Sequence, residues 1–318
     1  MKSFILASLA ASTLALSEIE SSFLSFISEY ERNYGTLEEY GFRLSQFVRA
    51  HREIEEHNAK ETSWKLGHNQ FSDWTIEEYE ALLTYRPHDE EEFNANLELF
   101  PEVLGGARPI DWRNKGKVQK IKDQGQCGSC WTFSATSAIE SMWAIKHGNL
   151  GSYAEQVLVD CDTRSYGCNG GNQSTAYNYF KSHNEVNESD YRYTARDGKC
   201  KYSSVPHTKV STTGYKTVAR NSPDQMKAAL SNNPLSVSLH ANNSFERYRN
   251  GIFNDTSCGT RMNHAVNVVG WGQSGNTDYW IMRNSWGRTW GESGYMRVQI
   301  HAGSGICGIQ QEAQYPTV

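Results

Sequence analysis

The sequence predicts an α+β protein in which a helix-rich part precedes a strand-rich part. Three observations lead to this prediction. Apolar residues recur with helical spacing through the first third of the chain and again after residue 129. Short β-rich segments separated by glycines dominate from residue 235 onward. Helices followed by strands, without regular alternation, are typical of α+β folds, and a length of 318 residues suits about two domains.

The chain begins with one lysine and an apolar run rich in alanine, serine and leucine, followed directly by an acidic segment. The run is too short to span a bilayer, so we interpret residues 1–17 as a signal peptide. No other segment has eighteen consecutive apolar residues, and we expect no membrane-bound product. The protein is therefore expected in the secretory pathway, with a lysosome, a vacuole or the extracellular space as its destination.

The segment after the signal peptide predicts two acidic helices within residues 20–60. In the second helix, residues spaced by three or four positions share one face; they are Glu39, Arg43, Phe47, Ala50, Ile54 and Asn58. Residues 1–106 carry a net charge of −12 and residues 107–318 a net charge of +7. Opposite charges predict that the two parts attract each other. The basic residues of the second part are scattered, which argues against a nucleic-acid-binding protein.

Residues 86–106 are polar, acidic and end in glycines, which predicts an exposed, cleavable linker. Beyond it we expect helices over 129–147, 154–160, 174–183 and 225–230, the first ending at Gly148 and the last following the cap Ser222 and Pro223. Strands are expected over 235–240, 264–272, 279–283 and 294–300. A cleft between the helical and the strand-rich half would hold an extended peptide.

Cys130 lies at the predicted start of a helix, in the sequence Q-G-Q-C-G-S-C-W that begins at Gln124. Free backbone N–H groups and the positive end of the helix dipole favour a thiolate there. A C-x-x-C pair also occurs in redox proteins and zinc sites. The βαβ pattern of a redox protein is missing, and Cys161 and Cys168 are too far apart for a second zinc pair. The segment therefore favours a nucleophilic cysteine.

These residues resemble the papain family of cysteine proteases, and its cathepsin L-like branch most closely. The resemblance rests on C-G-S-C-W at 127–131, on His264, which follows Cys130 by 134 residues, and on N-S-W-G from Asn284. The helix face over 39–58 is similar to the E-R-F-N-I-N pattern of the family's propeptides, with Ala50 replacing an asparagine. G-H-N-Q-F-S-D over 67–73 is similar to their G-x-N-x-F-x-D motif.

The resemblance implies a papain-like fold of two subdomains, a helical half and a β-barrel-like half, preceded by a helical prodomain. It implies a signal peptide over 1–17, an inhibitory propeptide over 18–105 and a peptidase domain over 106–318. The implied function is a cysteine endopeptidase made as a zymogen. The 32-residue interval from Cys168 to Cys200 leaves little room for the cleft-blocking loop of carboxydipeptidase relatives, which favours an endopeptidase. The alternative is a non-catalytic binding or disulfide-exchange protein on the same framework.

The same resemblance assigns roles and partners. Cys130 would attack the substrate, His264 would act as base and acid, Asn284 would orient the imidazole under Trp286, and Gln124 would help form an oxyanion hole. Asn263 stands where the family often has aspartate. The implied partners are protein and peptide substrates, the chain's own propeptide as an intramolecular inhibitor, and cystatin-like inhibitors. We expect a monomer without metal or organic cofactor.

Substrate-binding residues also follow from the resemblance. Gly170 and Gly171 would bring the substrate backbone into β-pairing, and Trp290 would form an aromatic wall on the leaving-group side. Glu312 would lie at the base of the pocket for the P2 side chain, the S2 pocket, and would favour arginine or lysine there beside apolar residues. The expected walls of this pocket are Gln173, Ser238, Met262 and Ala265.

The chain has seven cysteines, so one thiol remains over, and six cysteines alone allow fifteen disulfide connectivities. The resemblance implies the pairs Cys127–Cys168, Cys161–Cys200 and Cys258–Cys307. Four N-x-S/T sequences are candidate glycosylation sites. They begin at Asn172, Asn187, Asn242 and Asn254. Asn172 is the least suitable of them, because it borders the predicted S2 wall, where a glycan would obstruct the substrate.

Overall fold

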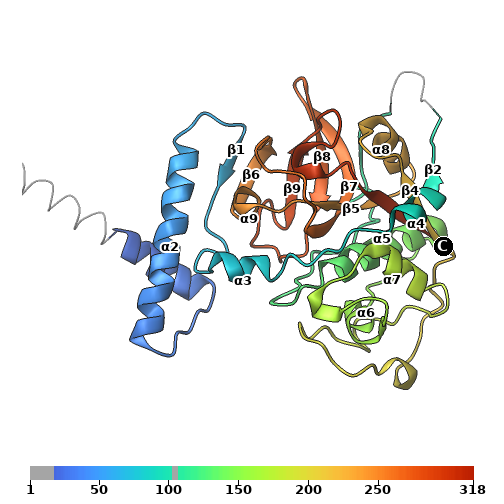
Figure 1. Cartoon of the computed structure of the whole chain (residues 1–318), viewed down its shortest axis with the longest axis horizontal. Helices are drawn as coiled ribbons and strands as arrows, with labels where there is room; N and C mark the ends of the chain where they lie inside the picture. The colour runs from blue at the N-terminus through green and yellow to red at the C-terminus, as the bar shows by residue number, and fades with distance from the viewer. Residues whose placement is uncertain (1–17, 102–106) are drawn as a thin grey trace, which may run out of the picture.

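The protein was analysed as a computed structural model that describes residues 18–101 and 107–318. The predicted signal peptide and the predicted processing site near Gly106 lie outside these residues. Residues 18–29 form a helix, and α2 (Leu37–Asn58) packs on it through a small aromatic core that includes Phe23, Phe26 and Phe47. Figure 1 shows α2 at one end of the molecule, beside the strand-rich half.

The expected face of α2 is the one that makes contacts. Phe47, Ala50 and Ile54 are buried. Arg43 forms two hydrogen bonds with the Glu78 carboxylate, at 2.6 and 2.7 Å. The helix begins after Thr36, whose hydroxyl accepts a hydrogen bond from the Glu39 backbone N–H and so satisfies a free donor of the first turn.

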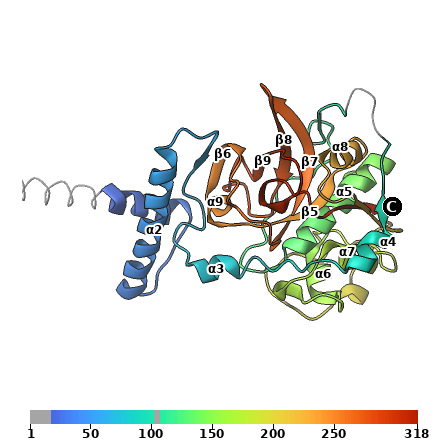
Figure 2. The same cartoon turned by 45° about the horizontal axis from the view of Figure 1, so that its top comes forward.

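The segment predicted to be the propeptide is called the prosegment below. The rest of it is mostly extended, with β1 (Trp64–Leu66), α3 (Ile76–Glu80), α4 (Glu90–Ala95) and β2 (Leu97–Glu98). Figures 1 and 2 both show the stretch from α3 to α4 running along the boundary between the helical and the strand-rich half. The linker predicted over 86–106 is therefore wrong for its first part. His88 and Phe93 are buried, because this stretch packs against the peptidase part instead of extending into solvent.

The helical half holds α5 (Cys130–His147), α6 (Glu155–Cys161) and α7 (Gln173–Tyr179), with 3-10 turns at Gly167–Asn169 and Tyr202–Ser204. Helix α5 ends as predicted at Gly148, which has the left-handed φ of 82° that glycine adopts without steric cost. In the strand-rich half, α8 (Pro223–Leu230) begins after the predicted Ser222 cap, and α9 (Asn243–Glu246) and a 3-10 turn (Ile306–Gly308) are short.

The strands form one sheet in the order β1-β6-β9-β8-β7-β5-β10-β4-β2, with β3 paired to β7. The strands not yet delimited are β3 (Ile110–Asp111), β4 (Gly214–Val218), β5 (Leu235–Leu239), β6 (Tyr248–Phe253), β7 (His264–Ser274), β8 (Thr277–Arg283), β9 (Tyr295–Gln299) and β10 (Ala313–Thr317). None of the helices within the described residues is long and apolar enough to cross a membrane.

The expected β-barrel-like half is an open sheet. Its two end strands, β1 and β2, both come from the prosegment, and no pairing between described residues joins them. β1 runs antiparallel to β6, and β2 runs parallel to β4. The prosegment therefore covers both edges of the peptidase sheet, whose backbone groups would otherwise lack strand partners.

Candidate active site

Helix α5 and strand β7 bring the predicted nucleophile and base to the boundary between the two halves. The Ser134 hydroxyl of α5 donates to the Val266 carbonyl at 2.8 Å, and the Asn267 side chain donates to the Ser134 carbonyl at 2.9 Å. Both contacts are buried, so they fix the start of α5 against the start of β7. Cys130 and His264 are the first residues of these two elements.

The Cys130 thiol is the free cysteine among the described residues and is fully buried. Burial raises the pKa of the Cys130 thiol to about 11. Hydrogen bonds with nearby backbone groups lower the pKa, that with Ala265 most, but their effect is smaller than that of burial. Ala265 directly follows His264. The thiol is therefore neutral here, whereas the helix position alone predicted a thiolate.

His264 is held by Asn284 and Trp286. Its Nε2 donates to the Asn284 side-chain oxygen at 2.8 Å, and the Trp286 ring stacks on the imidazole with centroids 4.6 Å apart. The other ring nitrogen, Nδ1, is buried and has no hydrogen-bond partner in the described part of the chain. Burial lowers the pKa of His264 to about 4 and outweighs the opposite effect of Asn284. The imidazole is therefore neutral while the prosegment is in place.

Gln124 is linked to the same tryptophan loop. Its side-chain oxygen accepts hydrogen bonds from the Ser285 hydroxyl at 2.7 Å and from the Trp286 ring N–H at 3.1 Å. Its Nε2 donates to the Cys127 carbonyl at 2.9 Å, and an amide NH₂ group has a second N–H beyond that one. The side chain is thus fixed near the start of α5.

The prosegment lies over this site. Tyr85 pairs with Gly171 in a parallel bridge, and the Arg86 N–H donates to the Gly171 carbonyl at 3.0 Å. A Cβ on Gly170, whose φ is 110°, would lie 2.1 Å from the Thr84 carbonyl oxygen. The glycines predicted to pair with the substrate backbone therefore pair with the prosegment, and only glycine permits this close approach.

The motif over 67–73 holds the prosegment on the strand-rich half. The Phe71 ring meets Trp286 edge-to-face at 5.0 Å, and the Asn69 side chain donates to the Glu246 carbonyl at 2.7 Å. Trp290, predicted as a leaving-group wall, is fully buried and donates to the same carbonyl at 3.0 Å. The motif thus contacts Trp286, the tryptophan that stacks on His264.

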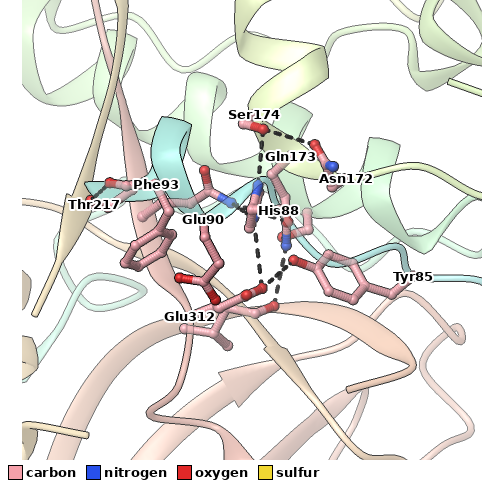
Figure 3. Close-up of polar contacts among 12 residues, drawn as sticks. Tyr85, His88, Glu90, Phe93, Asn172, Gln173, Ser174, Thr217 and Glu312 are labelled. Carbon is pink, nitrogen blue, oxygen red and sulfur yellow. Dashed lines mark hydrogen bonds and ion pairs between the residues drawn. The ribbon is translucent and has the colours of Figure 1, made fainter. Parts of the chain in front are cut away.

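The predicted S2 residues surround the Tyr85 side chain. The Tyr85 hydroxyl donates to Oε2 of Glu312 at 2.5 Å, and both residues are buried (Figure 3). Ala265 and the partly buried Met262 belong to the same apolar cluster as Tyr85. Gln173 is buried and is hydrogen-bonded to Val237 and Gln314. Burial also raises the pKa of Glu312.

Three residues at this pocket were not identified from the sequence. Tyr85 directly precedes the stretch predicted to be a linker, and His88 lies within it. Arg220 lies 3.4 Å from Oε1 of Glu312. His88 contacts the Ser174 hydroxyl at 2.9 Å and the Gln314 side chain at 2.7 Å. The signal available in the sequence was the aromatic Tyr85 directly before this stretch and the apolar Phe93 within its acidic run.

The described cysteines form three disulfides, with the pairing that the resemblance implied. They are Cys127–Cys168, Cys161–Cys200 and Cys258–Cys307. The first joins the loop before Cys130 to the loop that carries Gly170 and Gly171. It therefore ties the nucleophile's helix start to the backbone that pairs with the prosegment.

Comparison with known proteins agrees with this arrangement. Residues 107–317 match the model of the papain family cysteine proteases, and residues 23–79 match the cathepsin propeptide inhibitor domain. The chain is 40% identical to digestive cysteine proteinase 1 of Homarus americanus, covering 96% of this chain and 97% of that protein.

Two further relatives show the same likeness. The probable cysteine protease RD21B of Arabidopsis thaliana is 42% identical over 83% of this chain, which spans 58% of that longer protein. The digestive procathepsin L 3 of Tenebrio molitor larval midgut has a similar structure, with a TM-score of 0.83, 34% identity and coverage of 94% of this chain and 99% of that one.

A buried thiol at a helix start, an imidazole bonded to an asparagine and a prosegment across both define an inhibited cysteine peptidase. The chain belongs to the papain family of cysteine proteases. It combines the peptidase domain with a propeptide inhibitor domain, as expected for a zymogen of a cysteine endopeptidase.

Proposed function

We propose that Cys130, His264, Asn284 and Gln124 carry out peptide-bond hydrolysis once the prosegment has left. The observation that carries this proposal is the orientation of His264. Its Nε2–H is engaged by Asn284, so in the neutral ring the buried Nδ1 has no proton and is free to take one. Removal of the prosegment hydrates both groups, which reverses the burial that holds them neutral and favours the thiolate–imidazolium pair.

The reaction then proceeds in two steps. The Cys130 sulfur attacks the scissile carbonyl carbon, the C–N bond breaks, and the imidazolium gives its proton to the leaving amine, which leaves a thioester. Water attacks the thioester with His264 as base, releasing the acid and the thiol. The second Gln124 side-chain N–H and the Cys130 backbone N–H stabilise the oxyanion, worth about 3 kcal/mol per donor.

The test is a Cys130→Ala variant of the full chain, processed by an added protease because it would not process itself. Hydrolysis should fall by more than about 1000-fold, while the fold and the affinity for the prosegment stay the same. Iodoacetamide should label Cys130 in the activated wild type and abolish its activity. Residual hydrolysis above a thousandth of wild type, or labelling without loss of activity, would favour the non-catalytic alternative.

We propose a secretory-pathway protein that acts as a monomer in a lysosome, a vacuole or outside the cell, with cystatin-like proteins as candidate inhibitors. The apolar run over 1–17 and the three disulfides support export, because disulfides persist in oxidising compartments. N-terminal sequencing of the exported protein tests this. A product that begins at Met1 would contradict a cleaved signal peptide.

Among the four candidate glycosylation sites we propose Asn187, whose side chain is exposed. The Asn187 amide donates one exposed hydrogen bond, to the Asp190 carboxylate at 3.2 Å, whereas the other three side chains hold elements of the fold in place. Asn172 and Asn242 cap helices, and the Asn254 oxygen accepts from the prosegment Trp64 ring N–H at 3.0 Å. A mass loss on treatment with an N-glycosidase should disappear in Asn187→Gln, and its persistence would contradict this assignment.

A further inference from the structure

The S2 pocket of the zymogen is occupied by a tyrosine whose hydroxyl is recognised by a buried carboxylate. Tyr85 donates to Oε2 of Glu312 at 2.5 Å, and Glu312 is only 2% exposed. The pocket offers a second polar atom, because the buried Ser238 hydroxyl has no hydrogen-bond partner within the described residues. An aromatic ring that ends in a hydroxyl therefore matches the polar atoms of this pocket (Figure 3).

The other oxygen of Glu312 has a cation beside it. Arg220, a residue of the peptidase part, lies with Nη2 3.4 Å from Oε1 of Glu312. In the zymogen Arg220 also pairs with the Glu90 carboxylate at 2.9 Å and stacks on the Phe93 ring at 4.2 Å. Both of these partners belong to the prosegment and leave with it. Once the prosegment has left, Arg220 keeps one ion-pair partner among the described residues, which is Glu312.

This pairing changes what the pocket accepts. A carboxylate without a partner would favour arginine or lysine at P2, which is what the sequence alone predicted. A carboxylate already paired with Arg220 gains little from a second cation, and two cations close together repel each other. Oε2 is still available to a neutral hydrogen-bond donor, and a phenol reaches it without adding charge.

We propose that Glu312, held by Arg220, makes tyrosine the preferred P2 residue of the activated enzyme, over both phenylalanine and arginine. This proposal rests on the proposed peptidase function and deepens it by naming the substrate class. Phenylalanine fills the same apolar walls but leaves the carboxylate oxygen without a donor, which costs binding in a buried site. In the zymogen, Tyr85 already makes the contact with Glu312 that a substrate tyrosine at P2 would make.

The experiment uses the full chain after activation by removal of its prosegment. It compares kcat/KM at pH 5.5 for four fluorogenic peptides that differ only at P2, with tyrosine, phenylalanine, O-methyltyrosine or arginine. Tyrosine should exceed phenylalanine about tenfold, the effect of a hydrogen bond to a charged acceptor. O-methyltyrosine keeps the ring and the oxygen but has no proton to donate, so it should lose this advantage. Arginine should also be cleaved more slowly than tyrosine.

Two variants separate the contributions of the pair. Glu312→Ala should bring the tyrosine-to-phenylalanine ratio to about one. Arg220→Gln should leave that ratio above five and should raise the arginine-to-phenylalanine ratio about tenfold, because the carboxylate then lacks its internal cation. Asp224→Asn, which removes an exposed charge at the start of α8, is the matched control and should change neither ratio.

The outcomes are distinguishable. Equal rates for tyrosine, phenylalanine and O-methyltyrosine in the wild type overturn the proposal even if the Glu312 variant does not fold. Arginine cleaved faster than tyrosine, or an arginine-to-phenylalanine ratio unchanged by Arg220→Gln, overturns the role of Arg220. Hydrolysis of none of the four peptides contradicts the peptidase function itself and not the choice at P2.

Discussion

His88 should make binding of the prosegment depend on pH, and the structure gives the size of the effect. The residue is 8% exposed and lies between α7 and β10. The Gln314 amide donates to its Nε2, so its Nδ1 carries the proton and donates to the Ser174 hydroxyl. The imidazole is therefore bound in its neutral form, and a second proton has no acceptor at Nε2.

The charged groups around His88 act in both directions. Burial lowers the pKa of His88 to about 3, and Arg220 lowers it further than any other charge does. Glu312, 3.9 Å from Nε2, would favour the protonated ring, but its two oxygens already face Tyr85 and Arg220. Glu90 is paired with Arg220. Burial is the largest effect, so the neutral form prevails while the prosegment is bound.

The sign follows from proton counting. Released His88 has an ordinary pKa of about 6.5, so between pH 6.5 and 3 the released prosegment holds one proton more than the bound one. Binding through this group is therefore complete above pH 6.5 and weakens as the pH falls, by about tenfold per pH unit. From pH 7 to pH 4.5 the loss from His88 alone should be about 100-fold.

The assay compares the inhibition constant of the wild-type prosegment with that of His88→Gln, against the activated enzyme at pH 7.0, 5.5 and 4.5. Glutamine stays neutral, so the wild-type constant should rise about 100-fold more than that of the variant between pH 7.0 and 4.5. Glu91→Gln, which removes an exposed charge from α4, the helix that follows His88, should behave as wild type. Parallel pH profiles for wild type and His88→Gln would refute the reasoning.

Three further outcomes are expected. Phe71→Ala should weaken inhibition by the prosegment at least 100-fold, because it deletes a buried ring packed on Trp286 and such losses cost about 3–5 kcal/mol; an unchanged inhibition constant would contradict this. Asn284→Ala should lower kcat of the activated enzyme about 10- to 100-fold by freeing the imidazole, and an unaltered kcat would remove the orienting role. Glu53→Gln should raise the inhibition constant a few-fold at low salt, since its carboxylate lies 3.0 Å from Arg247, and the difference should vanish at high salt.

Local features of the fold were predictable because they depend on residues close together in the chain. The end of α5 at Gly148 and the Ser222 cap of α8 follow from glycine's backbone freedom and from side-chain capping. The buried face of α2 follows from its spacing. Strand β10 was not predicted, because Pro316 argues against a strand. The structure tolerates it since β5 pairs only with Ala313 and Gln314, which leaves the proline beside β4 alone.

The sequence by itself determined the family, the zymogen organisation and which residue types stand at the reactive positions. Only the tertiary structure decided their state. Cys130 and His264 are neutral because they are buried, and burial depends on segments far apart in the chain. The same holds for Glu312. Its sequence position indicated an S2 carboxylate, but Arg220 and Tyr85, 92 and 227 residues away, decide which side chain it binds, because charge and hydrogen bonding act through space.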